Sequence, residues 1–112
     1  MKKIEAIIRP GKLDDVKDAL SHHGVNGLTV TQVIGCGKQK GHTQVYRGVE
    51  YNVHLIPKVK IEIVAKDSAV EDIIQVITKE ARTGEIGDGK IFVSSMENAY
   101  TIRTGAVGDD AL

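Results

Sequence analysis

The stretch Lys60-Ile61-Glu62-Ile63-Val64-Ala65 decides the fold, because it repeats the start of the chain, Lys3-Ile4-Glu5-Ala6-Ile7-Ile8, at an offset of 57 residues. Both stretches are rich in β-branched side chains and alternate in character, which is typical of a strand with one buried face. The similarity continues downstream, where residues 13–20 align with residues 70–77. Apolar residues recur there at helical spacing, so each half of the chain predicts a strand followed by a helix.

Further strand-like runs complete each half, at residues 28–34 and 90–95. The order strand, helix, strand therefore occurs twice. We expect an α+β fold of the ferredoxin-like type, with two βαβ units that form one antiparallel sheet and two helices on one face. A long loop separates the second and third strands, and a short additional strand is expected at residues 100–103.

The expected helices carry end signals. Ser68 and Glu71 have the spacing of a capping box at the start of the second helix. Gly24 and Gly84 follow the two helical segments, and glycine is the residue type that most often ends a helix. The sequence therefore predicts the helix boundaries as well as the helices.

Composition narrows the class of protein. The 112 residues suffice for one domain, and the 15 basic and 15 acidic residues cancel, which argues against a non-specific nucleic-acid or membrane-surface binder. No apolar run is long enough to cross a membrane, the acidic Glu5 is unlike a signal peptide, and the single cysteine Cys36 fits a reducing cytoplasm. The chain has one phenylalanine and no tryptophan, so its core consists mainly of smaller aliphatic side chains. Such a small domain would gain stability by burying further apolar area against copies of itself, which predicts a homo-oligomer.

Residues 37–57 join the two halves and are longer than a connection between strands requires. They are polar, cationic at their start, and contain Tyr46 and Tyr51. Exposed tyrosines favour contact with a partner or covalent modification. Two interpretations remain open: a functional signalling loop, or a poorly ordered hairpin with a weak strand at residues 44–53.

Residues 82–90 contain the skeleton of a phosphate-binding loop, G-x-x-x-x-G-K, from Gly84 to Lys90. Ile91 occupies the position of the magnesium-binding hydroxyl, and the motif leads into a strand instead of a helix, so a P-loop nucleotidase is rejected. The local chemistry survives, because closely spaced glycines expose backbone N–H groups to an anion and Lys90 adds a positive charge. An ordinary glycine-rich turn is the alternative. Arg103, in the C-terminal segment 101–112, is a further candidate partner for phosphate.

Four stretches together carry a resemblance that covers nearly the whole chain: residues 46–51, 57–62, 83–93 and 102–105. They resemble the PII family of nitrogen-regulatory signal transduction proteins. The resemblance implies a cytoplasmic homotrimer that binds ATP or ADP in clefts between subunits. With Mg-ATP bound, it would also bind 2-oxoglutarate and change the shape of the loop. It implies a regulatory binding protein, not an enzyme.

The resemblance also assigns roles to residues. It implies that the nucleotide contacts Ile7, Gly27, Thr29, Gly35, Gly37, Lys38, Gln39, Glu62, Val64, Gly87, Asp88, Gly89, Lys90 and Arg103. It implies that 2-oxoglutarate contacts Gln39, Lys40, Gly41, Lys58 and Gly87. Gln39 would hold magnesium through its amide oxygen, and Tyr51 corresponds to the tyrosine that some relatives have uridylylated. For Glu62 a solvated strand carboxylate, and for Lys58 a lysine that discourages edge pairing, are the alternatives.

Some positions depart from the common PII pattern. Lys38 and Thr101 stand where many members have arginine, and Val49 and His54 differ within the long loop. A loss of bidentate contacts at Lys38 and Thr101 would alter the preference between ATP and ADP. The targets that the resemblance allows include an ammonium transporter, nucleotidyltransferases and a histidine kinase. The rival functions are a PII-like sensor of another metabolite such as bicarbonate in carbon uptake, a slow ATPase with Asp88 as the water activator, and a purely structural oligomer.

Overall fold

The computed structural model of the chain describes residues 1–36, 43–46, 49–52 and 55–112, with side chains described outside residues 36–54. Its main sheet is antiparallel and has the strand order β2-β5-β1-β6. The strands are β1 (Lys2–Ile8), β2 (Thr29–Cys36), β5 (Leu55–Ala65) and β6 (Lys90–Ser95). The two strands of the sequence repeat, β1 and β5, are therefore direct neighbours at the centre of the sheet.

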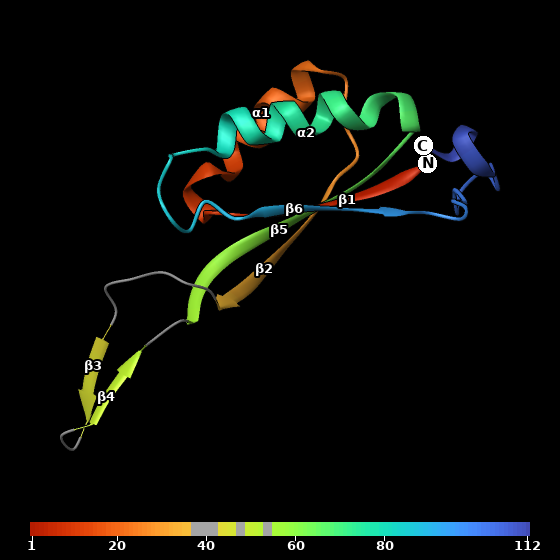
Figure 1. The fold of residues 1–112 in the computed structure, drawn as a ribbon. Coiled ribbons are helices and arrows are strands. Elements are labelled where there is room, and N and C mark those ends of the chain that lie inside the picture. Colours follow the sequence, from red (N-terminus) through yellow and green to blue (C-terminus); the bar gives the residue numbers. More distant parts are fainter. Residues whose placement is uncertain (37–42, 47–48, 53–54) are drawn as a thin grey trace.

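Both α-helices, α1 (Leu13–His22) and α2 (Asp67–Ala81), cover the same face of this sheet (Figure 1). Two short 3-10 helices, η1 (Pro10–Lys12) and η2 (Gly108–Ala111), precede α1 and end the chain. This arrangement confirms the predicted ferredoxin-like double βαβ fold. In the described part of the chain, no helix has the length and apolar character needed to cross a membrane.

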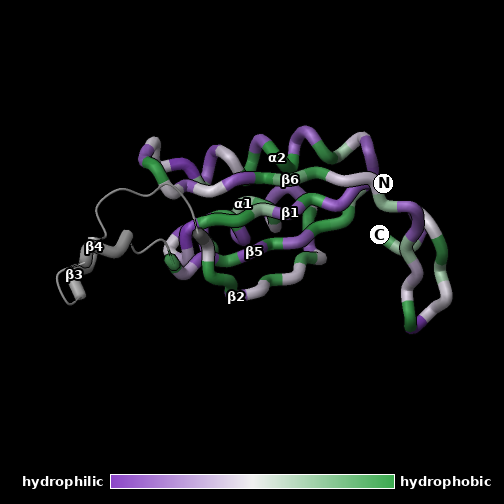
Figure 2. The backbone as a smooth tube through the Cα atoms, turned by 60° about the horizontal axis from the view of Figure 1, so that its bottom comes forward, coloured by the Kyte–Doolittle hydropathy of each residue, from purple (hydrophilic) through white to green (hydrophobic). Residues whose placement is uncertain are grey.

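The core lies between the sheet and the helices, and strand register explains its composition. Pairing of β1 with β5 places Ile4 opposite Ile63 and Ala6 opposite Ile61, and all four side chains are buried. Because alternate residues of a strand face opposite sides, the intervening polar residues lie on the other face. Figure 2 shows how hydrophilic and hydrophobic residues follow one another along β1 and β5, and the buried positions alternate along both strands. The helices contribute buried Val16, Leu20, Val70, Ile73, Val76, Ile77 and Ala81.

The face of the sheet away from the helices carries a row of charges. Glu5 and Glu62 lie directly opposite one another on β1 and β5. Lys3 connects them, with Nζ 2.8 Å from Glu5 Oε1 and 3.4 Å from Glu62 Oε2. Lys60 lies 3.4 Å from the other oxygen of Glu62. Hydrogen bonds from Lys60 and Lys3 lower the pKa of Glu62, so the carboxylate is charged at neutral pH.

Two predicted helix signals are wrong. The residue that caps α2 is Lys66, and no side chain caps the helix, so Ser68 and Glu71 lie inside it and form no capping box. Helix α2 ends at Ala81 with an extended Arg82, which moves Gly84 from the helix end into the following turn. Gly24, by contrast, has φ +82° directly after the last turn of α1, as the sequence predicts.

The long segment between β2 and β5 contains a hairpin of β3 (Thr43–Tyr46) and β4 (Val49–Asn52), which pair only with each other in a separate sheet. A strand within residues 44–53 was one of the two sequence interpretations, and paired strands are present there. Strand β5 already begins at Leu55, so the last three residues of the expected loop belong to the main sheet. Pro57 lies beyond the end of β1, where β5 has a single neighbour and proline is tolerated.

The additional strand expected at residues 100–103 is absent from the described structure. Tyr100 forms one isolated bridge to Val107, and the chain turns between them. The Thr101 N–H donates to Ala106 O at 2.9 Å, and Gly105 N–H donates back to Thr101 O at 2.8 Å. These bonds close a compact turn, which explains why an apolar residue such as Ile102 is fully exposed there instead of pairing in a strand.

Candidate functional site

The strand residues implicated by the sequence share one face of the sheet. Ile7 pairs with Lys60 and with Lys90, while Thr29 pairs with Glu62. Paired residues project to the same side of a sheet, and this is the side away from the helices. Gly35, Lys58 and Val64 belong to the same set by register. The structure therefore brings all the predicted strand contacts to the open face.

The glycine-lysine turn joins α2 to β6 and requires its glycines. Gly84, Gly87 and Gly89 have φ values of +90°, +104° and +102°, which side chains of L-residues rarely adopt. Gly89 has a second reason to be glycine, because a Cβ atom there would lie 1.7 Å from the carbonyl oxygen of Ile7. The turn therefore rests directly on the end of β1.

The carboxylate of Asp88 closes this turn on itself. Oδ2 accepts the backbone N–H groups of Thr83 and Gly84, both at 2.8 Å. Oδ1 accepts the Thr83 hydroxyl and the Arg9 Nε–H, the latter at 3.1 Å. The hydroxyl of Thr83 and these other donors hold the pKa of Asp88 well below its ordinary value, so the group is a carboxylate throughout the physiological range.

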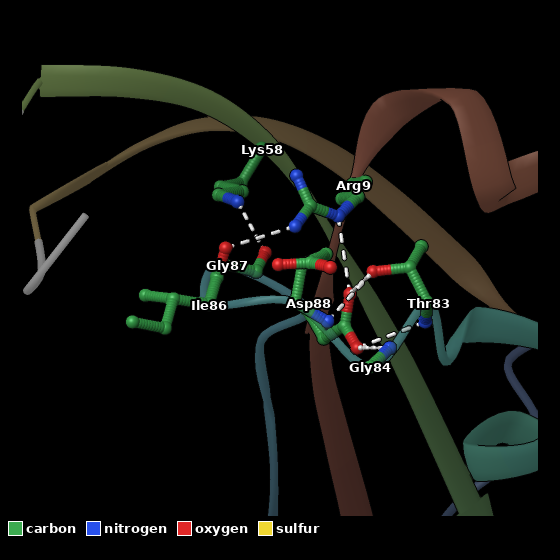
Figure 3. Close-up of polar contacts among 8 residues, drawn as sticks. Arg9, Lys58, Thr83, Gly84, Ile86, Gly87 and Asp88 are labelled. Atoms are coloured by element: carbon green, nitrogen blue, oxygen red, sulfur yellow. Dashed lines mark hydrogen bonds and ion pairs between the residues drawn. The ribbon is translucent and has the colours of Figure 1, made fainter. Parts of the chain in front are cut away.

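Two cationic side chains hold the carbonyl groups of the same turn (Figure 3). The Nη2 of Arg9 donates to Ile86 O at 2.9 Å, and the Nζ of Lys58 donates to Gly87 O at 2.5 Å. Arg9 follows β1 and Lys58 lies on β5, so the turn is tied to both central strands of the sheet. A cluster of Arg9, Lys58 and Asp88 therefore carries one net positive charge beside the predicted phosphate-binding glycines.

Lys58 is the electrostatic feature that stands out. Its relative exposure is 8%, and it is the one charged residue that is buried among the residues described. Burial lowers the pKa of Lys58, the positive charge of Arg9 lowers it further, and Asp88 acts in the opposite direction. Within the described residues no carboxylate lies at ion-pair distance from its Nζ, which bonds to a neutral carbonyl.

The predicted ligand residues form two groups within one chain. The first group gathers at one end of the sheet: Ile7, Gly35, Lys58, Gly87, Asp88, Gly89 and Lys90. Its internal contacts include the approach of Gly35 to Lys58, where a Cβ atom would lie 3.1 Å from Lys58 Cγ. The second group lies further along the sheet, since Glu62 follows Lys58 by four residues of strand, or roughly 13 Å. It comprises Gly27, Thr29, Glu62 and Val64.

Arg103 belongs with the second group. Strand β6 begins at Lys90 and runs toward the chain's N-terminus, where Met96 N–H donates to Met1 O at 3.2 Å. The C-terminal segment continues beyond this end (Figure 1). Arg103 and Lys90 are therefore at opposite ends of the sheet, and a single chain does not bring them to one ligand.

Several predicted residues lie outside the described part of the chain: Gly37, Lys38, Gln39, Lys40 and Gly41. The predicted magnesium contact of Gln39 is among them. Tyr51 lies in β4 and pairs with Gln44. These assignments stay predictions.

A groove of about 340 Å³ lies beside the turn, between the second half of α2 and the start of β6. Its walls include Ile74, Ile77 and Ile91, which belong to the helix side of the sheet. Four of the predicted ligand residues also line it: Ile7, Asp88, Gly89 and Lys90. The groove therefore borders the first group of predicted ligand residues, at the point where the glycine-lysine turn enters β6.

Sequence reasoning missed Arg9 and Thr83. Both act on residues that only the fold brings near, since Arg9 reaches Asp88 across 79 positions of sequence. A weak local signal existed for each: Arg9 directly follows a strand, and Thr83 precedes a glycine that needs a positive φ. The carboxylate of Asp88 is directed to its own turn and to Arg9, and the predicted contact of this residue with nucleotide stays a prediction.

Comparison with known proteins gives the family of the chain. The family described as "Nitrogen regulatory protein P-II" matches residues 1–106. Proteins of that name from Mesorhizobium japonicum and Azospirillum brasilense are 61% and 59% identical to this chain, and one from Haemophilus influenzae is 55% identical. Each alignment spans 112 residues and covers both chains completely. With its double βαβ fold and a match over almost its full length, the chain belongs to the nitrogen regulatory protein P-II family.

Proposed function

We propose that this P-II protein is a regulatory adaptor that senses ATP or ADP together with 2-oxoglutarate. Its output is the shape of residues 37–57, which selects target proteins. The observation that carries the proposal is the buried, positively charged Lys58 beside the glycine-lysine turn. Lys58 lies near the start of β5, directly after the long segment. A ligand bound at Lys58 would therefore be next to residues 37–57, whose shape is proposed to change.

The environment of Lys58 favours a dianionic ligand. A buried ammonium group is costly unless an opposite charge accompanies it, and its present acceptor is the neutral Gly87 carbonyl. Arg9 adds a second positive charge nearby. A carboxylate of 2-oxoglutarate would supply the missing negative charge, with Gln39, Lys40, Gly41 and Gly87 as further contacts. Nucleotide phosphates would bind at Gly37, Lys38, Gln39, Gly87, Gly89 and Lys90, and magnesium at Gln39.

The separation of the predicted ligand residues supports a site between subunits. Each chain offers one group around Lys90 and another around Arg103, at opposite ends of its sheet. A cyclic homotrimer would place the first group of one subunit against the second group of the next. Exposed apolar side chains in one chain agree with burial in such an assembly: Phe92, Tyr100, Ile102 and Val107.

Among the residues that the structure describes, the glycine-lysine turn supports binding better than catalysis. A slow ATPase would need Asp88 of this turn as its water activator. The four hydrogen bonds and lowered pKa of Asp88 make it a poor base. We therefore infer a cytoplasmic regulator without enzymatic turnover, acting on targets such as an ammonium transporter, a nucleotidyltransferase or a histidine kinase. Uridylylation of Tyr51 would be a second input.

Calorimetry on the full chain tests the proposal. We expect 2-oxoglutarate to bind only when Mg-ATP is present. In Lys58→Met, binding of 2-oxoglutarate should weaken by at least roughly thirtyfold, since removal of one partner of a buried charge pair costs about 2 kcal/mol or more. Binding of ATP should persist. Lys17→Met is the matched control, because Lys17 is exposed on α1.

Unchanged 2-oxoglutarate binding by Lys58→Met would refute the role of Lys58. An absence of 2-oxoglutarate binding in the wild-type chain with Mg-ATP would refute the proposed sensor. A parallel titration with bicarbonate separates the rival metabolite, which carries a single charge and would satisfy Lys58 less completely.

A further inference from the structure

Ordering the glycine-lysine turn costs conformational entropy. Gly84, Gly87 and Gly89 make the unfolded turn unusually free, and fixing each residue of a backbone costs about 1–2 kcal/mol. A ligand that had to order the turn itself would lose that free energy from its affinity. A turn that is already ordered would avoid the loss.

The hydrogen bonds of Thr83 and Asp88 provide such order. The Asp88 carboxylate reaches back to the N–H groups of Thr83 and Gly84. The Thr83 hydroxyl donates to Asp88 and accepts the N–H of Glu85 at 3.1 Å. One hydroxyl and one carboxylate thus close residues 83–88 into a ring, and all four bonds of the carboxylate are made within the protein.

Charge gives a second argument. A carboxylate that pointed toward bound phosphate would repel it, yet Asp88 lies in the centre of the predicted phosphate turn. Its inward direction and its contact with Arg9, at 3.1 Å, remove that conflict (Figure 3). The side chain therefore serves the shape of the turn, because its charge is compensated by Arg9 and not by a ligand.

We propose that Thr83 and Asp88 are positioning residues, which hold the glycine-lysine turn in its nucleotide-binding shape before the nucleotide arrives and whose side chains do not touch it. The proposal rests on the nucleotide site of the proposed function. It assigns the Thr83 hydroxyl a role that the sequence did not indicate, and it changes the role of Asp88 from ligand contact to support.

The test compares Thr83→Val, which removes the hydroxyl at constant size, with Thr83→Ser, which keeps it. Calorimetry gives the dissociation constants for ATP and ADP. We expect Thr83→Val to weaken both by the same factor, roughly tenfold for a lost hydrogen bond and a loosened turn. Thr83→Ser should restore binding to within about twofold, since its hydroxyl can make the same bonds. Asp88→Asn is a second route to the same loss.

Thr78→Val is the control for replacing a threonine by valine, because the Thr78 hydroxyl donates to Ile74 O within α2, away from the turn. NMR-detected hydrogen exchange of the Gly84 amide supplies a readout without nucleotide. We expect this amide to be protected in the ligand-free wild-type chain and in Thr83→Ser, and to exchange at least roughly tenfold faster in Thr83→Val.

Three results would overturn the positioning role: unchanged nucleotide affinity in both Thr83→Val and Asp88→Asn, a loss confined to ATP, or an unprotected Gly84 amide in a wild-type chain that binds nucleotide. A loss confined to ATP would indicate contact with the terminal phosphate. A wild-type chain that bound no nucleotide would instead refute the proposed function.

Discussion

Replacing Gly89 with alanine tests the close contact between the turn and β1. The added Cβ atom would lie 1.7 Å from the Ile7 oxygen, 2.8 Å from the Ile7 carbonyl carbon and 3.4 Å from Ile8 Cα. These neighbours are backbone atoms of a central strand, and Ile7 pairs with Lys90 directly after the turn. No side-chain rotation can relieve the overlap. The start of β6 must therefore move away from β1.

Two contributions set the size of the effect. Alanine at φ +102° costs about 1–2 kcal/mol relative to glycine. Separation of β6 from the end of β1 removes one or two ladder hydrogen bonds, at about 0.5–1.5 kcal/mol each. Alanine also restricts the unfolded chain, which returns about 0.5 kcal/mol. These contributions sum to a net loss of about 1–4.5 kcal/mol in the free energy of unfolding, and we expect a value of about 2.5 kcal/mol.

Gly84→Ala is the matched control. Gly84 has φ +90°, but an added Cβ atom would have no neighbour within 4 Å. Only the conformational contribution remains, and we expect a loss of about 1 kcal/mol. Urea unfolding at one fixed protein concentration measures both variants, and the concentration must match because association adds to apparent stability. In thermal unfolding the loss should be about 4 °C for Gly84→Ala and about 10 °C for Gly89→Ala. Equal stabilities for the two variants, within about 0.5 kcal/mol, would refute the reasoning.

Three further predictions concern the core, the turn and the assembly. Leu20→Ala removes a fully buried side chain and should cost about 2–5 kcal/mol in urea unfolding, and a cost below about 1 kcal/mol would contradict the packing. The pKa of Asp88 is lower in the folded chain than its ordinary value of 3.8, so its stabilisation is present above about pH 4 and is lost as the pH falls further. When the pH is lowered from about 5 to about 2, the free energy of unfolding should therefore fall less in Asp88→Asn than in the wild type. An equal fall in the two proteins, measured by urea unfolding at each pH, would contradict this. Ile102→Asp places a charge at an apolar side chain that is fully exposed in one chain. The mass measured by sedimentation should fall toward the 12.1 kDa of one chain, while the circular dichroism stays unchanged. Retention of the wild-type mass would argue against burial of Ile102 in the assembly.

Local pattern accounts for most of the fold that could be predicted. The repeat around Lys3 and Lys60 and the apolar spacing in both helices report burial directly, because one face of each element meets the core. The failures lie where tertiary context competes with local preference. Ser68 has the spacing of a cap, yet the helix starts one residue earlier at Asp67, whose carboxylate lies 3.0 Å from the N-terminal amine of Met1. The apolar Ile102 resembles a strand residue but lies in a turn closed by backbone bonds.

The candidate site also has features that the local sequence predicted and features that only the fold revealed. The spacing of Gly84, Gly89 and Lys90 predicted a glycine-rich turn from the sequence alone, with an anion site and an ordinary turn as the two interpretations, because glycines report a backbone constraint that is local. The sequence could not indicate that Arg9 would bond Asp88, or that Lys58 would be buried against Gly87. Those contacts depend on strand register, which places the end of β1 beside the start of β5 at one end of the sheet.

The glycine-lysine turn was thus determined by its own residues, down to the need for positive φ at its glycines. The charge around it was decided only by the tertiary structure. A lysine on a strand is ordinarily a solvated side chain, and its sequence neighbours do not reveal otherwise. Burial of Lys58 arises because the turn folds back over β5, with Arg9 and Asp88 holding it there. Burial and pairing are properties of segments that meet in space, so they follow from the assembled sheet and not from the order of residues.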